Sequence, residues 1–230
     1  MSLRRVKLGN KPRGLRRHRR VRRWPSLVIG LTGSIAMGKS TAAAFFRHLR
    51  IPVFDADAAV HLLMGPQGKA TKRVAARFPG VVGPKGVDRK ALGAKVFADL
   101  AGLRDLEAII HPLVRQDREH FLRQAALRRL PMVVLDIPLL FEGKGEHMCD
   151  LVVVISAPDF LQRQRALARP TMTPQRLEGI LAQQWPDARK RRHAHAVIPS
   201  SLGKRETLRR LKQFLTLART RPSRSSHPHA

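Results

Sequence analysis

Short apolar runs and helical patterns alternate along the chain from residue 27 to residue 217. Continuous apolar runs are typical of strands buried on both faces, and helices between such strands are typical of a parallel sheet. The sequence therefore predicts an α/β protein with a three-layer fold and a parallel central sheet. The predicted strands are Leu27–Thr32, Ile51–Asp55, Met132–Asp136, Leu151–Ile155 and Ala196–Ile198. The predicted helices span 39–49, 57–64, 68–77, 88–98, 103–129, 158–168, 173–184 and 203–217.

The stretch between the second and third predicted strands is long and nearly all helical in pattern. We interpret residues 57–129 as an inserted helical domain over the carboxyl ends of the strands, which is where open α/β sheets bind ligands. The predicted core comprises about 27–56, 130–157 and 196–217.

Charge is distributed unevenly along the sequence. The chain has 230 residues, and 45 Lys and Arg against 16 Asp and Glu give a formal net charge of +29. Residues 1–26 carry eleven of these positive charges and residues 218–230 carry three, which leaves +15 for 27–217. A positive field favours anionic partners, such as polyphosphates, nucleic acids or acidic membrane surfaces.

Both ends of the chain are expected to be flexible. The run Arg16–Arg23 cannot bury an apolar face, so residues 1–26 are interpreted as a disordered basic arm. Three roles stay open for this arm: binding of nucleic acid or a membrane surface, organellar targeting, and a translated leader without function. Residues 218–230 are of low complexity and are expected to form a flexible basic tail.

Composition excludes several classes of protein. No apolar run approaches the ~20 residues that span a bilayer, so no membrane span is expected. The single cysteine, Cys149, excludes an internal disulfide framework and suits a reducing compartment, so we expect a cytoplasmic location. The chain has no Tyr and two Trp, which argues against aromatic stacking on single-stranded nucleic acid. The oligomeric state is left open, with a monomer favoured.

A phosphate-binding loop follows the first predicted strand. The segment fits G-x-x-x-x-G-K-[ST] and opens a helix, as such loops require. Backbone N–H groups and the helix N-terminus would surround the phosphates of ATP. Lys39 would reach the β- and γ-phosphates, and the Ser40 hydroxyl would bind Mg²⁺. The residues predicted to bind ATP here are Gly33, Ser34, Ile35, Ala36, Met37, Gly38, Lys39, Ser40 and Thr41.

Ala36 occupies a position in this loop where glycine is the more usual choice. If the backbone there has a positive φ, alanine costs about 1 kcal/mol relative to glycine. The sequence therefore predicts a slightly strained loop that still binds nucleotide.

Carboxylates follow two of the predicted strands. Asp55 and Asp57 end the second strand, and we expect Asp55 to cap the next helix while Asp57 accepts the proton of an attacking hydroxyl. Asp136 ends the third strand, which is the pattern that holds Mg²⁺ in many nucleotide-hydrolysing enzymes. For Asp136 a structural role stays equally open.

Four motifs in order along the chain resemble the dephospho-CoA kinase family. They are Leu31–Thr41 (LTGSIAMGKST), Phe54–Asp57 (FDAD), His111–Val114 (HPLV) and Asp136–Glu142 (DIPLLFE), and the resemblance runs from about residue 27 to residue 217. It implies ATP-dependent phosphorylation of the ribose 3′-hydroxyl of dephospho-CoA, which is the last step of coenzyme A synthesis. It also implies a nucleotide-binding core, a helical substrate-binding domain and a lid at about 158–195.

The resemblance also implies roles for particular residues. Asp57 would be the general base, and Arg89 would face the substrate. His111 would begin an element of the substrate-binding domain, as a substrate contact or as a helix-start residue packed against Pro112. The segment Pro138–Leu140 would form an apolar wall for the substrate, and Glu142 would make a backbone or lid contact.

Two arginines in the expected lid match arginines of the family. Arg165 and Arg169 are four residues apart, so they would share one helix face and clamp the transferring phosphoryl group. Thr173 is predicted to cap the following helix, with Pro174 at its first position. The charge run 187–193 is interpreted as a solvated helix. His195 and residues 199–201 depart from the family pattern, so no side chain is assigned to adenine recognition.

Two other functions remain as alternatives. One is a different small-molecule kinase of the same fold. The other is a nucleic-acid-binding protein with a phosphate-binding loop, which would use the arginine-rich arm. Nucleic acid is not expected as the main partner, because the ordered motifs favour dephospho-CoA.

Overall fold

The computed structural model describes residues 26–97 and 99–220. Residues 1–25 of the expected basic arm and 221–230 of the expected basic tail lie outside these residues. The described chain divides into two compact units, and each is considered by itself. The sheet unit comprises 27–53 and 134–220, and the helical unit comprises 54–133.

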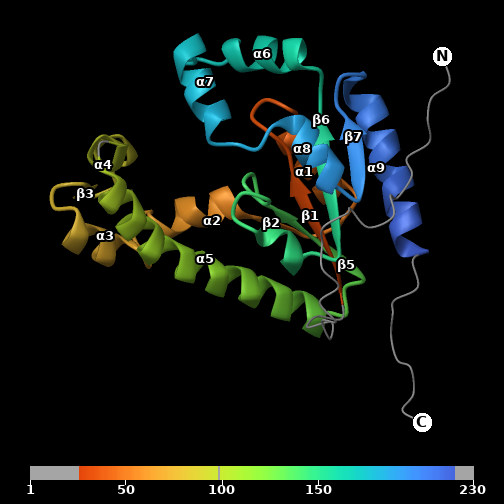
Figure 1. Cartoon of the computed structure of the whole chain (residues 1–230). Helices are drawn as coiled ribbons and strands as arrows, with labels where there is room; N and C mark the ends of the chain where they lie inside the picture. The colour runs from red at the N-terminus through yellow and green to blue at the C-terminus, as the bar shows by residue number, and fades with distance from the viewer. Residues whose placement is uncertain (1–25, 98, 221–230) are drawn as a thin grey trace. The chain divides into compact units, whose positions relative to one another are not determined.

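A five-stranded sheet forms the centre of the fold, in the order β2-β5-β1-β6-β7. Strand β6 pairs in parallel with both β1 and β7, with Ile29 opposite Leu151 and Val153 opposite Ala196 (Figure 1). The predicted α/β fold with a parallel sheet is confirmed. The strands are β1 (Leu27–Thr32), β2 (Val53–Asp55), β5 (Met132–Asp136), β6 (Leu151–Ser156) and β7 (Ala196–Pro199).

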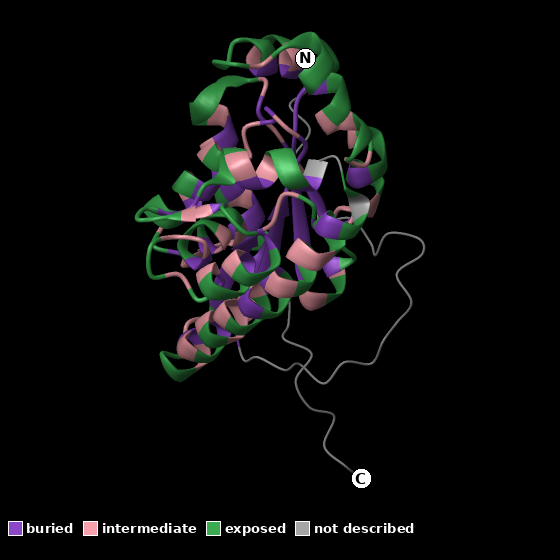
Figure 2. Ribbon diagram, turned by 90° about the vertical axis from the view of Figure 1, so that its left-hand side faces the viewer, coloured by how far each residue is buried: buried purple, intermediate pink, exposed green. Residues whose placement is uncertain are grey.

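Strands β1, β5 and β6 are almost wholly buried, as their continuous apolar sequences predict, whereas the three residues of β2 are half-buried. Every residue of β5 and β6 is buried, and so are five of the six residues of β1 (Figure 2). The sheet unit also contains several helices. They are α1 (Lys39–His48), the 3₁₀ helix η1 (Gly145–Met148), α6 (Asp159–Leu167), α7 (Pro174–Ala182), α8 (Asp187–His193) and α9 (Gly203–Arg219).

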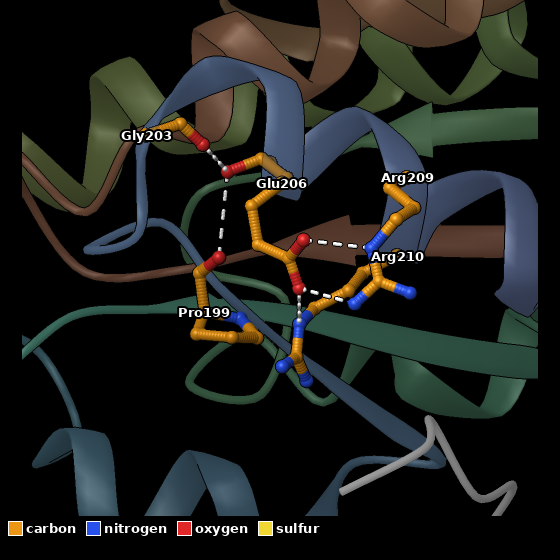
Figure 3. Close-up of polar contacts among 6 residues, drawn as sticks. Pro199, Gly203, Glu206, Arg209 and Arg210 are labelled. Atoms are coloured by element: carbon orange, nitrogen blue, oxygen red, sulfur yellow. Dashed lines mark hydrogen bonds and ion pairs between the residues drawn. The ribbon is translucent and has the colours of Figure 1, made fainter. Parts of the chain in front are cut away.

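Polar contacts fix the start of α9 after the last strand (Figure 3). The Thr207 hydroxyl lies 2.9 Å from the carbonyl oxygen of Gly203 and 3.4 Å from that of Pro199. Glu206 accepts hydrogen bonds from the guanidinium groups of Arg209 and Arg210 at 2.6–2.7 Å. These bonds, that of Arg209 foremost, hold the pKa of Glu206 at about 2, well below its ordinary range.

The helical unit packs its helices around one apolar cluster, to which Leu63, Val74, Leu92 and Leu113 belong. A short antiparallel hairpin, which the sequence did not predict, accompanies the helices. Each strand of the hairpin has two residues, which is too short to leave an alternating pattern in the sequence. The elements are α2 (Ala56–Leu63), α3 (Thr71–Arg77), β3 (Val82–Gly83), β4 (Gly86–Val87), α4 (Arg89–Phe97) and α5 (Leu100–Leu127).

Helix α5 begins three residues earlier and ends two residues earlier than predicted. Asp99 caps it by accepting a 2.8 Å hydrogen bond from the backbone N–H of Ala101, and the helix continues through Pro112. His111 therefore lies inside α5 and is exposed. The expectation that His111 begins an element is wrong, because the cap at Asp99 starts the helix well before the proline.

Candidate active site

The N-terminus of α1 is open to an anion. Its N-cap residue, Gly38, is in the left-handed conformation with φ 88°, and within the described residues no side chain caps the helix and its first turn holds no acid. The first N–H groups of a helix have no partner inside it, and they carry a partial positive charge. The end of the predicted phosphate-binding loop thus presents donors suited to phosphate oxygens.

Two glycines allow the loop its path. A Cβ atom at Gly33 would lie 2.7 Å from the carbonyl oxygen of Ile155, so no larger residue fits there. Gly38 has a positive φ that L side chains rarely adopt. Both glycines of the sequence pattern are therefore required by local geometry.

Ala36 carries the strain predicted from the sequence. Its φ is 60°, in the left-handed region, where a Cβ atom is unfavourable. The residue is buried, and it belongs to an apolar cluster with Ala166 of α6 and Leu177 of α7. The Cβ atom thus has packing partners that offset part of the cost of the backbone conformation.

Lys39 and Asp136 meet beside the loop. The Lys39 Nζ atom lies 2.7 Å from Oδ1 of Asp136, and their side chains are 15% and 3% exposed. The strand and the helix that carry them place an ammonium group and a carboxylate at the carboxyl end of the sheet. This is the edge at which open α/β sheets bind ligands.

Arg165 is held against the loop through Ser200. Its guanidinium group donates to Oγ of Ser200 at 2.9 Å and to the Ser200 carbonyl oxygen at 3.0 Å. The Ser200 hydroxyl in turn donates to the carbonyl oxygen of Met37 at 2.8 Å. This arrangement fixes a positive charge beside the phosphate-binding loop.

Arg169 does not share a helix face with Arg165. Helix α6 ends at Leu167, and Arg169 lies beyond its C-cap residue and is exposed. The prediction of a paired face is wrong because the helix stops before Pro170.

The prediction for the next helix is confirmed: Thr173 caps α7 by accepting a 3.2 Å hydrogen bond from the N–H of Arg176, and Pro174 is at its first position.

Glu142 makes the contacts expected of it. Its Oε1 atom accepts a 2.6 Å hydrogen bond from the backbone N–H of Trp185 and lies 2.9 Å from Nζ of Lys190. Lys190 of α8 is completely buried, although its neighbours Arg191 and Arg192 are exposed. The interpretation of the charge run as a solvated helix is therefore wrong for Lys190, which is buried and forms an ion pair with Glu142.

The apolar segment after β5 does not form one continuous wall. The carbonyl oxygen of Pro138 accepts a 2.8 Å hydrogen bond from the Thr32 hydroxyl. Leu139 is 44% exposed, whereas Leu140 is completely buried in the core. Only Pro138 and Leu139 are thus available to a ligand, and Leu140 packs inside.

The helical unit carries the remaining predicted residues. Asp55 caps α2 by accepting a 3.0 Å hydrogen bond from the N–H of Ala58, as predicted. Asp57 lies exposed in the first turn of this helix, so its carboxylate is available for chemistry. Arg89 is the first residue of α4 and is exposed, as is His111.

Sequence reasoning missed three residues that support the site: Gln162, Gln184 and Ser200. Each contacts the phosphate-binding loop through a single side-chain amide or hydroxyl group. These residue types are common on surfaces, and their partners are more than a hundred residues away in the sequence. No local pattern could have found them.

His195, for which no role was predicted, is structural, because its Nδ1 atom accepts a 3.0 Å hydrogen bond from the N–H of Val152.

Two wider features bear on the kind of site this is. Across residues 26–97 and 99–220, no group of three or more His, Cys, Asp or Glu is placed to hold a metal ion. In the same ranges, no helix has the length and apolar character needed to cross a membrane.

Comparison with known proteins agrees with this geometry. The sequence model described as dephospho-CoA kinase matches residues 27–205. A dephospho-CoA kinase of Rhodospirillum rubrum is 53% identical over 211 residues, which cover 89% of this chain and 100% of that protein. The dephospho-CoA kinase of Paramagnetospirillum magneticum is 60% identical over 164 residues, which cover 71% of this chain and 77% of that protein.

Solved structures agree as well. A crystal structure of a Thermus thermophilus protein has 32% sequence identity and a TM-score of 0.73, over 84% of this chain and 97% of that chain. The dephospho-CoA kinase of Campylobacter jejuni, at 22% identity and a TM-score of 0.59, covers 84% of this chain and 97% of its own and has the same fold.

Proposed function

The chain belongs to the dephospho-CoA kinase family, and from this premise we propose that it transfers the γ-phosphoryl group of ATP to the ribose 3′-hydroxyl of dephospho-CoA. The hydroxyl oxygen bonds to the γ-phosphorus, and the bond from that phosphorus to the β,γ-bridging oxygen breaks. The products are coenzyme A, ADP and the proton of the hydroxyl group. The observation that carries the proposal is the uncapped N-terminus of α1 beside the ion pair of Lys39 and Asp136.

ATP is bound by the phosphate-binding loop. The N–H groups at the start of α1, from Gly38 to Thr41, would donate to its phosphate oxygens. Lys39 would bind the β- and γ-phosphates, where its charge offsets the charge that develops on the leaving ADP. Arg165 would act on the transferring group from the position that Ser200 gives it, and Arg169 would add a second positive charge.

The residues beside the loop suit Mg²⁺. This ion prefers oxygen ligands and keeps most of its coordination for water and substrate phosphates, so it needs few protein ligands. The exposed Ser40 hydroxyl and the Asp136 carboxylate supply such oxygens, and larger ligand clusters are absent from the described residues. When bound, the ion neutralises phosphate charge and aligns the γ-phosphoryl group. The Asp136 carboxylate would then both accept the hydrogen bond from Lys39 and supply an oxygen to the ion.

We assign the binding of dephospho-CoA to residues of the helical unit and of the segment after β5. Asp57 would accept the proton of the 3′-hydroxyl, since its carboxylate is exposed and is not the one used as a helix cap. Arg89 and His111 are exposed groups that can bind the phosphates of dephospho-CoA. Pro138 and Leu139 would contact an apolar part of the acceptor. The single cysteine of the chain is consistent with action in the reducing cytoplasm.

A matched pair of variants tests the role of Asp57. Asp57→Asn removes the proton acceptor, so kcat should fall by about 10²- to 10⁴-fold while the affinity for ATP stays unchanged. Asp55→Asn is the control, because asparagine caps helices as well as aspartate does. The measurement is ADP release in a coupled assay with dephospho-CoA. Full activity of Asp57→Asn, or an equal loss in both variants, would contradict the assignment.

A further inference from the structure

Two glutamine side chains hold one residue of the phosphate-binding loop. The backbone N–H of Ile35 donates to Oε1 of Gln184 at 3.0 Å, and the carbonyl oxygen of Ile35 accepts from Nε2 of Gln162 at 2.9 Å. Gln162 lies in α6, and Gln184 follows the end of α7. Both backbone polar groups of Ile35 are thus used by side chains of the segment 158–195.

The chemistry of the backbone fixes the orientation of both amides. The N–H group of Ile35 can only donate, so it must face the oxygen of Gln184. The carbonyl group can only accept, so it must face the nitrogen of Gln162. The two glutamines therefore have distinct roles, one as acceptor and one as donor.

Apolar packing reinforces these two bonds. Ile35 and Ala36 pack in a cluster with Ala166 of α6, Leu177 of α7 and Leu181. Gln162 is buried and Gln184 is half-buried, so the bonds are partly shielded from water. The loop is thus bonded to a residue near the start of α6 and to a residue just after the end of α7.

The held residue adjoins the strained one. Ala36 has a φ of 60°, and the conformation persists only where its surroundings determine it. Hydrogen bonds on the Ile35 side and the contact of Ser200 with the Met37 carbonyl oxygen enclose Ala36 from both directions. Loss of one support would let the loop leave the conformation that aims its N–H groups at phosphate.

We propose that Gln162 and Gln184 are positioning residues, which hold the Ile35–Ala36 backbone in the conformation that binds the nucleotide phosphates. The segment 158–195, which the family resemblance assigns to a lid, thereby also stabilises the conformation of the phosphate-binding loop. This inference rests on the proposed function only for the identity of the nucleotide.

The test compares each glutamine with an exposed glutamine of the same segment. Gln184→Leu is matched by Gln183→Leu, and Gln162→Leu is matched by Gln164→Leu, since the side chains of Gln183 and Gln164 are exposed. Binding of ADP is measured by calorimetry, and the KM values for ATP and dephospho-CoA are measured by ADP release. Each test variant should bind ADP about two- to tenfold more weakly than its control, as expected for the loss of one hydrogen bond.

The KM for ATP should rise by a similar factor, and the KM for dephospho-CoA should stay unchanged. A purely structural role would lower the melting temperature and the active fraction but would leave the ADP affinity of the folded protein unaltered. The double variant Gln162→Leu/Gln184→Leu should lose less affinity than the product of the two single losses, because both side chains act on one residue.

Equal ADP affinity, within the error of measurement, in test and control variants would overturn the proposal. If Gln162→Leu does not fold, the comparison at the half-buried Gln184 decides alone. A wild-type protein that binds ADP but does not phosphorylate dephospho-CoA would contradict the proposed function and leave this test intact.

Discussion

The buried ion pair of Glu142 and Lys190 gives a sharp prediction for stability. Lys190→Met replaces the ammonium group by an apolar side chain of similar length. Glu142 then keeps the N–H of Trp185 as a donor to Oε1, while its buried Oε2 atom has no hydrogen-bond partner in the structure. The variant therefore leaves a carboxylate with most of its charge uncompensated.

The size of the effect follows from burial. Removal of one partner of a buried ion pair typically costs about 3–5 kcal/mol. The Glu142 side chain is 14% exposed and retains one donor, so we expect the lower end, about 3 kcal/mol. For a domain of this size that corresponds to a fall of roughly 6–12 °C in melting temperature. Thermal and urea unfolding of the purified protein, followed by circular dichroism, measure the change.

Two further variants separate charge from packing. Arg191→Met on the same helix removes an exposed charge and should change the melting temperature by less than about 2 °C. Glu142→Gln/Lys190→Met removes both charges and keeps an oxygen for the Trp185 N–H, so it should be more stable than Lys190→Met alone. A wild-type melting temperature in Lys190→Met, or a double variant less stable than the single one, would refute the reasoning.

Three other positions give separate predictions. Lys39→Met should weaken ATP binding by about 10- to 100-fold in calorimetry, because a charged hydrogen-bond donor is lost; unchanged affinity would contradict its role. Ala36→Gly should change the free energy of unfolding by less than about 1 kcal/mol, since relief of strain and loss of a buried methyl group nearly cancel, and a shift above 2 kcal/mol in urea unfolding would refute this. Glu206 has a folded-state pKa of about 2, below its ordinary 4.5, so its contribution to stability is present above pH 4.5 and disappears as the pH falls to 2. Glu206→Gln should therefore melt below the wild type at pH 6 and approach it at pH 2, and a constant difference would contradict the linkage.

The parts of the fold that the sequence predicted are those that local pattern determines. A strand buried on both faces must be apolar throughout, so β1, β5 and β6 could be read from continuous apolar runs. The phosphate-binding loop could be found because its glycines and lysine lie within one short segment. The cap at Asp55 could likewise be predicted, because a carboxylate directly before a helix is a local sequence signal.

The parts that could not be predicted depend on distant partners. Lys190 lies in a run of basic residues, and only Glu142, in another part of the chain, makes its burial possible. Gln162 and Gln184 reach Ile35 across the fold, and amide side chains carry no sequence signal for such a contact. The end of α6 was predicted to within one residue, but the pairing of Arg165 with Arg169 was inferred from their spacing of four, although Arg169 lies beyond the helix.

The central claim is that the chain phosphorylates the 3′-hydroxyl of dephospho-CoA. The most direct measurement incubates the purified protein with ATP, Mg²⁺ and a panel of acceptors that includes dephospho-CoA, shikimate, gluconate and a nucleoside, and follows ADP release. Phosphorus NMR of the product identifies the site of phosphorylation. We expect turnover of dephospho-CoA alone, with a new monoester on the 3′-oxygen. No turnover of dephospho-CoA, together with phosphorylation of another acceptor, would contradict the account.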